Sequence, residues 1–180
     1  MSNVKTPGGM LSFPNLFKPR ASVPGAEPRY SVNILFDAAA QKTPEFKALK
    51  QAIEDAIAAE WGAKANDPAF RRKLRNPIRD ASEKDYAGYD EGMVYISAWS
   101  KTKPGVINGR LQDMVESDVW AGQMARVSVR PFAYSQSGNT GVSLGLQNVQ
   151  IIKADMPRLD GRRKAQDDFD AVEDEEDAFA

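Results

Sequence analysis

The stretch that decides the fold is residues 120–153, WAGQMARVSVRPFAYSQSGNTGVSLGLQNVQIIK. Apolar and polar residues alternate with period two from 124 to 134, which is typical of a half-buried β-strand. The polar, glycine-rich SQSGNTG follows as a turn, and a second alternating run begins at Val142. After Gln147 the apolar positions shift to Val149 and Ile151, which indicates a β-bulge. We therefore predict a bulged β-hairpin.

The two faces of this hairpin differ in chemistry. One face of 124–134 carries small aliphatic residues, among them Ala125, Val127 and Val129. The other face carries Arg126, Ser128, Arg130, Phe132 and Tyr134. Arginines can hold phosphates and aromatic rings can stack on bases, so this second face suits a single nucleic-acid strand. A solvated sheet face with incidental aromatic residues is the alternative interpretation.

The run GMVYISAWSKTKPG, residues 92–105, has the same division. Val94, Ile96 and Ala98 are predicted to face the core, and Tyr95, Trp99 and Lys101 lie on the opposite face. Two strands with the same pattern favour base stacking over coincidence. The candidate nucleic-acid contacts of the two strands are Tyr95, Trp99, Lys101, Lys103, Arg126, Arg130, Phe132 and Tyr134.

A basic cluster follows the predicted helix start at Asp67-Pro68. It is the densest in the chain and consists of Arg71, Arg72, Lys73, Arg75 and Arg79. Such a run is commonly a solvated helix face. Beside a strand face of arginines and aromatic rings, it is equally a candidate for contact with nucleic acid.

The remaining pattern predicts a mainly β domain with one inserted helix. Strands are expected at 9–14 and 29–36, and a short strand at 106–107. Thr43-Pro44 has the features of a helix start, and an apolar stripe at helical spacing continues to Trp61, with Gly62 as the expected C-cap. Residues 80–92 are polar and are expected to form a loop that exposes Tyr86 and Tyr89.

Several function classes are excluded by composition. The chain has no cysteine and no histidine, which removes disulfides, thiolate metal sites and histidine-based catalysis. Phosphate-binding glycine motifs are absent, and the folded part shows no clustered acids typical of a magnesium nuclease site. We expect no cofactor and no metal. No apolar run is long enough to span a membrane, so a cytoplasmic location is expected.

The charges are segregated along the chain. All 24 Lys and Arg residues lie at or before Lys164, whereas eight of the 25 acidic residues lie between Asp167 and Asp177. The body therefore carries a net charge of +7, and a tail of −8 follows it. This asymmetry indicates a nucleic-acid partner for the body. The tail is either a solubilising segment or a partner motif made of Asp174, Glu175, Glu176, Asp177 and Phe179.

A family resemblance covers most of residues 8–153. It is carried, in order, by LSFPNLFKP, EPRYSVNILF, the 92–105 strand with its Pro-Gly end, and the hairpin, of which GVSLGLQNVQ is the most specific part together with SFPNLF. In these segments the chain resembles the single-stranded-DNA-binding proteins of tailed bacteriophages. The resemblance implies an OB-fold, a five-stranded and partly open barrel with an inserted helix. Acidic tails of such proteins end in an aromatic residue, whereas here Ala180 follows Phe179.

We therefore predict a flexible N-terminus over 1–8, an OB-fold domain over 9–155, and a disordered linker and acidic tail over 156–180. The predicted function is sequence-independent binding and protection of single-stranded DNA in phage replication or recombination, inside the infected bacterial cell. Phage or host replication proteins are possible partners of the tail. The alternatives are a carboxylate- and magnesium-dependent nuclease, and an interaction module that inhibits a host DNA enzyme.

Overall fold

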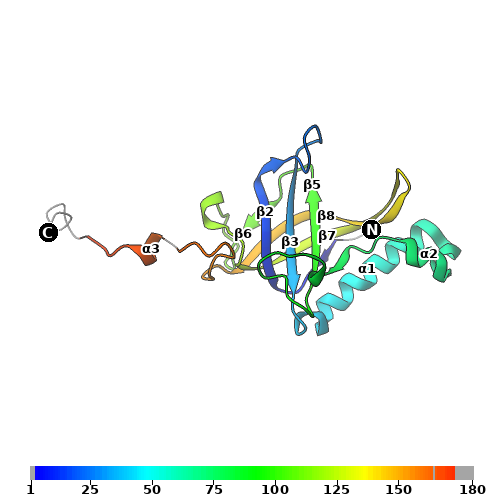
Figure 1. Cartoon of the computed structure of the whole chain (residues 1–180), viewed down its shortest axis with the longest axis horizontal. Coiled ribbons are helices and arrows are strands. Elements are labelled where there is room, and N and C mark those ends of the chain that lie inside the picture. Colours follow the sequence, from blue (N-terminus) through cyan, green and yellow to red (C-terminus); the bar gives the residue numbers. More distant parts are fainter. Residues whose placement is uncertain (1–2, 164, 173–180) are drawn as a thin grey trace.

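Five strands form a ring at the centre of the computed structural model, which describes residues 3–163 and 165–172 (Figure 1). They are β2 (Gly9–Arg20), β3 (Arg29–Phe36), β5 (Val94–Ser100), β7 (Met124–Gln136) and β8 (Asn139–Lys153). Antiparallel pairs join β2 to β3, β3 to β5, β7 to β8 and β7 back to β2. The parallel β5–β8 contact and the antiparallel β2–β7 contact consist of only two residue pairs each, so the barrel is partly open. This is the OB-fold arrangement that was predicted.

The hairpin of β7 and β8 has the predicted faces and the predicted bulge. Ala125, Val127 and Val129 are buried inside the barrel. Ser128 pairs with Asn148 but Val129 pairs with Leu146, so Gln147 is the extra residue. The bulge therefore lies at the residue where the apolar pattern changes phase.

Three short strands lie outside the ring: β1 (Val4–Lys5), β4 (Ile78–Asp80) and β6 (Gly105–Ile107). The prediction of a flexible N-terminus over 1–8 is wrong for β1, which pairs with Val129 and Ser128 of β7. Thr6 is buried, and its hydroxyl accepts a hydrogen bond from the Val127 amide at 3.1 Å. The polar N-terminal residues are ordered because they satisfy backbone groups of an edge strand.

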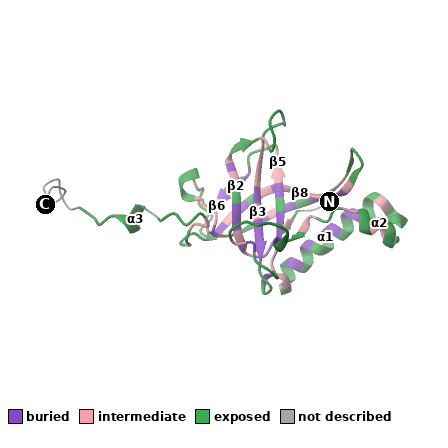
Figure 2. Ribbon diagram, in the orientation of Figure 1, coloured by how far each residue is buried: buried purple, intermediate pink, exposed green. Residues whose placement is uncertain are grey.

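The main helix α1 (Pro44–Trp61) has the predicted bounds. Thr43 caps it, since its hydroxyl accepts a hydrogen bond from the Phe46 amide at 3.2 Å. Its apolar face is buried in the barrel core (Figure 2). The short helix α2 (Pro68–Lys73) follows and is capped by Asp67. The remaining helical segments are η1 (Ala40–Lys42), η2 (Gly62–Asn66), η3 (Ala81–Glu83), η4 (Glu116–Asp118) and α3 (Ala165–Asp168).

A second, smaller apolar cluster lies apart from the barrel core and consists of Leu35, Ala81, Tyr89 and Tyr95. The prediction that Tyr89 is exposed is wrong, because only 6% of its surface is accessible. Its hydroxyl donates to Ser12 Oγ at 3.0 Å and accepts from Asn33 Nδ2 at 2.9 Å. Tyr86 is exposed, as expected.

The C-terminal boundary of the ordered part lies beyond the predicted residue 155. Trp120 Nε1 donates to the Met156 carbonyl at 3.0 Å, and the Leu159 amide donates to the Ala121 carbonyl at 3.0 Å. Residues 156–159 are therefore held on the barrel, in contrast to the predicted disorder, and α3 adds one short helix after them. None of the described helices is long and apolar enough to cross a membrane.

Gln123 ties the start of the hairpin to both segments that flank it. Its side chain is fully buried, and Nε2 donates to the carbonyls of Asp118 at 2.9 Å and Ala154 at 3.2 Å. Oε1 accepts from the Trp120 amide at 3.1 Å. One amide side chain thus satisfies backbone groups before β7 and after β8.

Replacing Gln123 by Leu should lower the free energy of unfolding by about 1–3 kcal/mol, because the carbonyls of Asp118 and Ala154 lose their donor and the Trp120 amide loses its acceptor. Urea unfolding measures this change. Gln51→Leu is the control, since exposed Gln51 bonds only to Asp55 on the same helix and its loss should change stability by less than about 0.5 kcal/mol. Equal stability of the two variants would contradict the role of Gln123.

Candidate nucleic-acid interface

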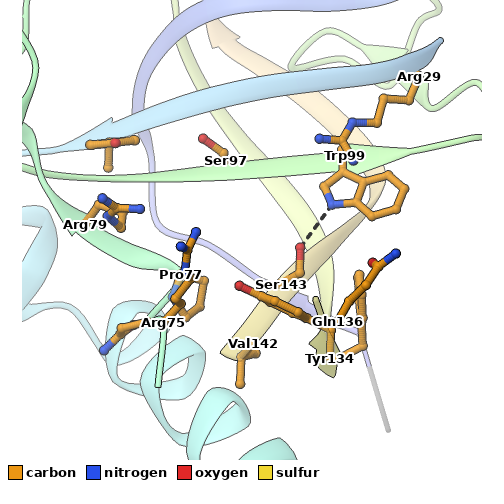
Figure 3. A pocket seen from close by; sticks show the side chains of 13 residues that line it. Arg29, Arg75, Pro77, Arg79, Ser97, Trp99, Tyr134, Gln136, Val142 and Ser143 are labelled. Carbon is orange, nitrogen blue, oxygen red and sulfur yellow. Dashed lines mark hydrogen bonds between the residues drawn. The ribbon is translucent and has the colours of Figure 1, made fainter. Parts of the chain in front are cut away.

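A groove of about 470 Å³ lies on the outer surface where β5 faces the β7–β8 hairpin (Figure 3). Aromatic rings, arginines and small polar side chains line it. These residues are Arg29, Arg75, Asn76, Pro77, Arg79, Tyr95, Ser97, Trp99, Phe132, Tyr134, Gln136, Val142 and Ser143. The lining includes three arginines and no Asp or Glu, and one of the arginines, Arg79, pairs with Glu83 at 3.0 Å just outside it.

Trp99 is held in place from three sides. Its Nε1 donates to Ser143 Oγ of β8 at 3.0 Å (Figure 3). The ring of Phe132 stands edge-on to the indole with centroids 5.9 Å apart. The guanidinium carbon of Arg29 lies 4.3 Å from the indole centroid, within the range of a cation–π contact. A ring held in place beside a cation is suited to stacking on an unpaired base.

The groove floor continues into a hydrogen-bonded polar network. Ser97 Oγ donates a hydrogen bond to Asn33 Oδ1 at 2.6 Å, and Asn33 Nδ2 donates to the Tyr89 hydroxyl at 2.9 Å. Tyr95 borders this floor but is only 5% exposed, because the Tyr89 ring packs 5.3 Å from its own. Burial raises the pKa of Tyr95 above its ordinary value. The expectation of an exposed Tyr95 ring is therefore wrong. Tyr95 lines the groove, but its ring is buried.

A strap of residues 75–79 brings two arginines to the groove. The Arg75 amide donates to the Thr140 carbonyl at 2.9 Å, and the Arg75 carbonyl accepts from the Val142 amide at 3.1 Å. A Cβ on Gly141 would lie only 2.6 Å from that carbonyl, so this close approach requires glycine. The strap then continues into β4, which pairs with β5 and carries Arg79. It thus spans from the hairpin to β5.

Six of the thirteen predicted contacts in the folded part line this groove: Arg75, Arg79, Tyr95, Trp99, Phe132 and Tyr134. The other seven do not, and four of them lie on or after β strands. Lys101 pairs with Glu27 at 3.0 Å, and Lys103 lies 5.7 Å from the Phe17 ring. Arg126 donates to Gln150 Oε1 at 2.7 Å, and Arg130 donates to Asn3 Oδ1 at 3.3 Å.

The remaining three, Arg71, Arg72 and Lys73, belong to α2. Arg71 forms an ion pair with Glu54 of α1, and this hydrogen bond raises the pKa of Arg71 above its ordinary value. Arg72 and Lys73 are exposed. The predicted cluster is therefore divided between the groove and a helix. The predicted tail motif of Asp174, Glu175, Glu176, Asp177 and Phe179 lies outside the described residues.

The sequence interpretation missed several lining residues. Arg29 and Ser143 could have been found, because in β3 and β8 they alternate with apolar residues that face the barrel core. They are therefore on the outer face of their strands. Asn76 and Pro77 carry no such signal, since they reach the groove only through the strap. Within 3–163 and 165–172, no three His, Cys, Asp or Glu side chains gather as metal ligands.

The comparisons with known proteins agree on one group. The family model described as "Enterobacter phage Enc34, ssDNA-binding protein" matches residues 2–179. No curated protein matches the sequence significantly.

Two solved structures illustrate the similarity. The single-stranded DNA-binding protein from bacteriophage Enc34 in complex with ssDNA is 23% identical, with a TM-score of 0.69 over 84% of this chain and 86% of that one. The single-stranded DNA-binding protein gp2.5 of bacteriophage T7 is 14% identical, with a TM-score of 0.60 over 96% of this chain and 99% of that one. The resemblance seen in the sequence is thus confirmed, and the chain belongs to the family of the Enterobacter phage Enc34 ssDNA-binding protein.

Proposed function

We propose that this chain binds single-stranded DNA without sequence preference in the groove between β5 and the hairpin. One observation carries the proposal: the groove combines the rings of Trp99 and Phe132 with the guanidinium groups of Arg29, Arg75 and Arg79, of which, among the described residues, only Arg79 has an ion pair, with Glu83 outside the lining. OB-folds bind oligonucleotides on the face of their second and third barrel strands, which here are β3 and β5. Family membership supports the same ligand.

Binding requires cations for phosphates and rings for bases. Arg29, Arg75 and Arg79 offer guanidinium donors along the groove, and Trp99 offers an indole for stacking. Arg29 covers one face of that indole, so a base that stacks there displaces the guanidinium and leaves its donors available to a phosphate. Each stacked base contributes about 1–3 kcal/mol.

This function needs no catalytic step and no cofactor, and we infer that the protein acts by binding alone. We place it in phage DNA replication or recombination in the infected bacterial cell, on the support of its phage family. The acidic residues from Asp167 onward are opposite in charge to the groove. We propose that they regulate binding or recruit replication proteins.

The test of the proposal is a titration of single-stranded and duplex oligonucleotides at several salt concentrations. The single strand should bind more tightly, because only unpaired bases can stack on the rings. The logarithm of its association constant should fall by about 0.7 per tenfold rise in salt for each phosphate neutralised. Equal affinity for the duplex would refute stacking, and a body that binds no DNA would favour the interaction module. Strand cleavage that EDTA abolishes would favour the nuclease.

Trp99→Leu should weaken single-strand binding by about 1–3 kcal/mol, because it removes the ring but keeps an apolar side chain at the β5–β8 contact. Fluorescence anisotropy of a labelled oligonucleotide measures the loss. Trp61→Leu is the control, because Trp61 packs against Phe70 and does not line the groove. The affinity of this control should equal that of the wild type. Unchanged affinity of Trp99→Leu would show that the groove is not the site.

The divided basic cluster allows a comparison at constant charge. Arg75→Gln with Arg79→Gln removes two groove cations, and Arg72→Gln with Lys73→Gln removes two from α2. The groove double variant should make the negative slope of log K against log salt shallower by about 1.4, or about 0.7 for each lost phosphate contact. The helix double variant should change the slope less. Equal slopes would mean that only the overall charge matters.

A further inference from the structure

Phe13 and Tyr86 form a pair of exposed aromatic rings that the groove does not include. Their centroids are 5.0 Å apart in an edge-on arrangement. Phe13 is 51% exposed and Tyr86 is 49% exposed. Single exposed hydrophobic residues are ordinary. Two exposed rings in edge-to-face contact form a larger apolar surface on which a ligand could pack.

The backbone at Phe13 is strained in a way that exposes the ring. Its φ is +45°, a left-handed conformation that bulky residues rarely adopt. The β2–β3 register is irregular between Ser12 and Asn15, and Asn15 Nδ2 donates to the Phe13 carbonyl at 3.3 Å. The neighbouring apolar residues Leu11 and Leu16 are buried, whereas Phe13 is not. Such strain persists where the surroundings enforce it, and it gathers at functional sites.

Tyr89 supports both rings and joins them to the groove. Its centroid lies 6.4 Å from Phe13 and 5.3 Å from Tyr86. On its other side it packs 5.3 Å from Tyr95, which lines the groove. Its hydroxyl is fixed by the polar network that ends at Ser97 on the groove floor. The exposed pair and the groove therefore rest on one rigid layer.

The strand order places Phe13 on the same sheet as the groove, while Tyr86 packs against it from the loop between η3 and β5. β2, β3 and β5 lie side by side (Figure 1). Ser12 pairs with Asn33, and Asn33 pairs with Ser97, across these three strands. Two strand spacings, about 10 Å in total, separate β2 from β5. A DNA strand that crosses the sheet from Trp99 covers this distance well within the roughly 4–16 nucleotides that one OB-fold binds.

We propose that Phe13 and Tyr86 form a second base-stacking subsite, which extends the single-stranded DNA path from the groove across β3 onto β2. The inference rests on the proposed function and names a further part of the same site. Its ligand is a base of the bound strand several nucleotides from the one on Trp99. The exposed rings are continuous with the groove layer, and this continuity favours DNA over a second protein.

The test uses the full-length chain and oligothymidylates of increasing length. Phe13→Asn with Tyr86→Ala removes both rings, and Asn tolerates the positive φ at 13. The shortest oligonucleotides that bind fill only the groove, so wild type and double variant should bind them equally. Longer ones should bind the variant at least about fivefold more weakly, which is the loss of one stacked base. Tyr86→Phe should bind like the wild type, because it keeps the ring.

Leu111→Asn is the matched control. Leu111 also has a positive φ, +65°, and is 73% exposed, but it lies in the turn after β6 and not in the groove. It should bind every length as the wild type does. Its result shows whether the change from an exposed apolar residue to Asn by itself alters affinity.

Three results would overturn the inference. They are equal binding of wild type and double variant at every length, an equal loss at every length including the shortest, and an equal loss in Leu111→Asn. If Trp99→Leu still weakens binding in the first case, the groove stands and only the second subsite fails. If Trp99→Leu has no effect either, the proposed function of the groove fails with it.

Discussion

The contact between β5 and β8 is the constraint on which the rest of the structure depends. β5 and β8 pair there only through Ala98 with Leu144 and Trp99 with Gly145, and the β2–β7 junction likewise has two residue pairs. Ala98 and Leu144 are buried in the core, and the Trp99 indole on the opposite side bonds to Ser143 of β8. The ring that we propose to stack on a base therefore also links β5 to β8 where these two strands share only two residue pairs. Trp99 thus contributes to the barrel as well as to the proposed site.

The sequence predicted the barrel, the helix and the hairpin because each is specified locally. Thr43-Pro44 and Gly62 bound α1, and the phase change at Gln147 marks the bulge. Alternation likewise placed Trp99, Phe132 and Tyr134 on the outer face, where all three line the groove. Period-two patterns decide which side of a strand a residue faces, and this is enough to find rings on a sheet.

The period-two alternation places a residue on the outer face of a strand but does not show which other segment packs over that face. Tyr95 faces outward as predicted, but the loop after η3 places Tyr89 over it and buries it. Arg75 enters the groove because the strap bonds to residues 140 and 142, a contact between distant parts of the chain. The N-terminal residues are ordered for a similar reason, since Thr6 pairs with Val127. Each of these three misses is a long-range contact made by a segment that has no periodicity of its own.

The bulge at Gln147 keeps the apolar residues of β8 on the inner face along the whole hairpin. Val142, Leu144 and Leu146 face the core before it, and Val149 and Ile151 face the core after it. Without the extra residue, a strict alternation would turn Val149 and Ile151 outward beside Arg126. With it, Asn148 and Gln150 take the outer positions opposite Ser128 and Arg126. The hairpin thus keeps one continuous apolar inner face, while its outer face changes from rings near the turn to amides and a cation near the base.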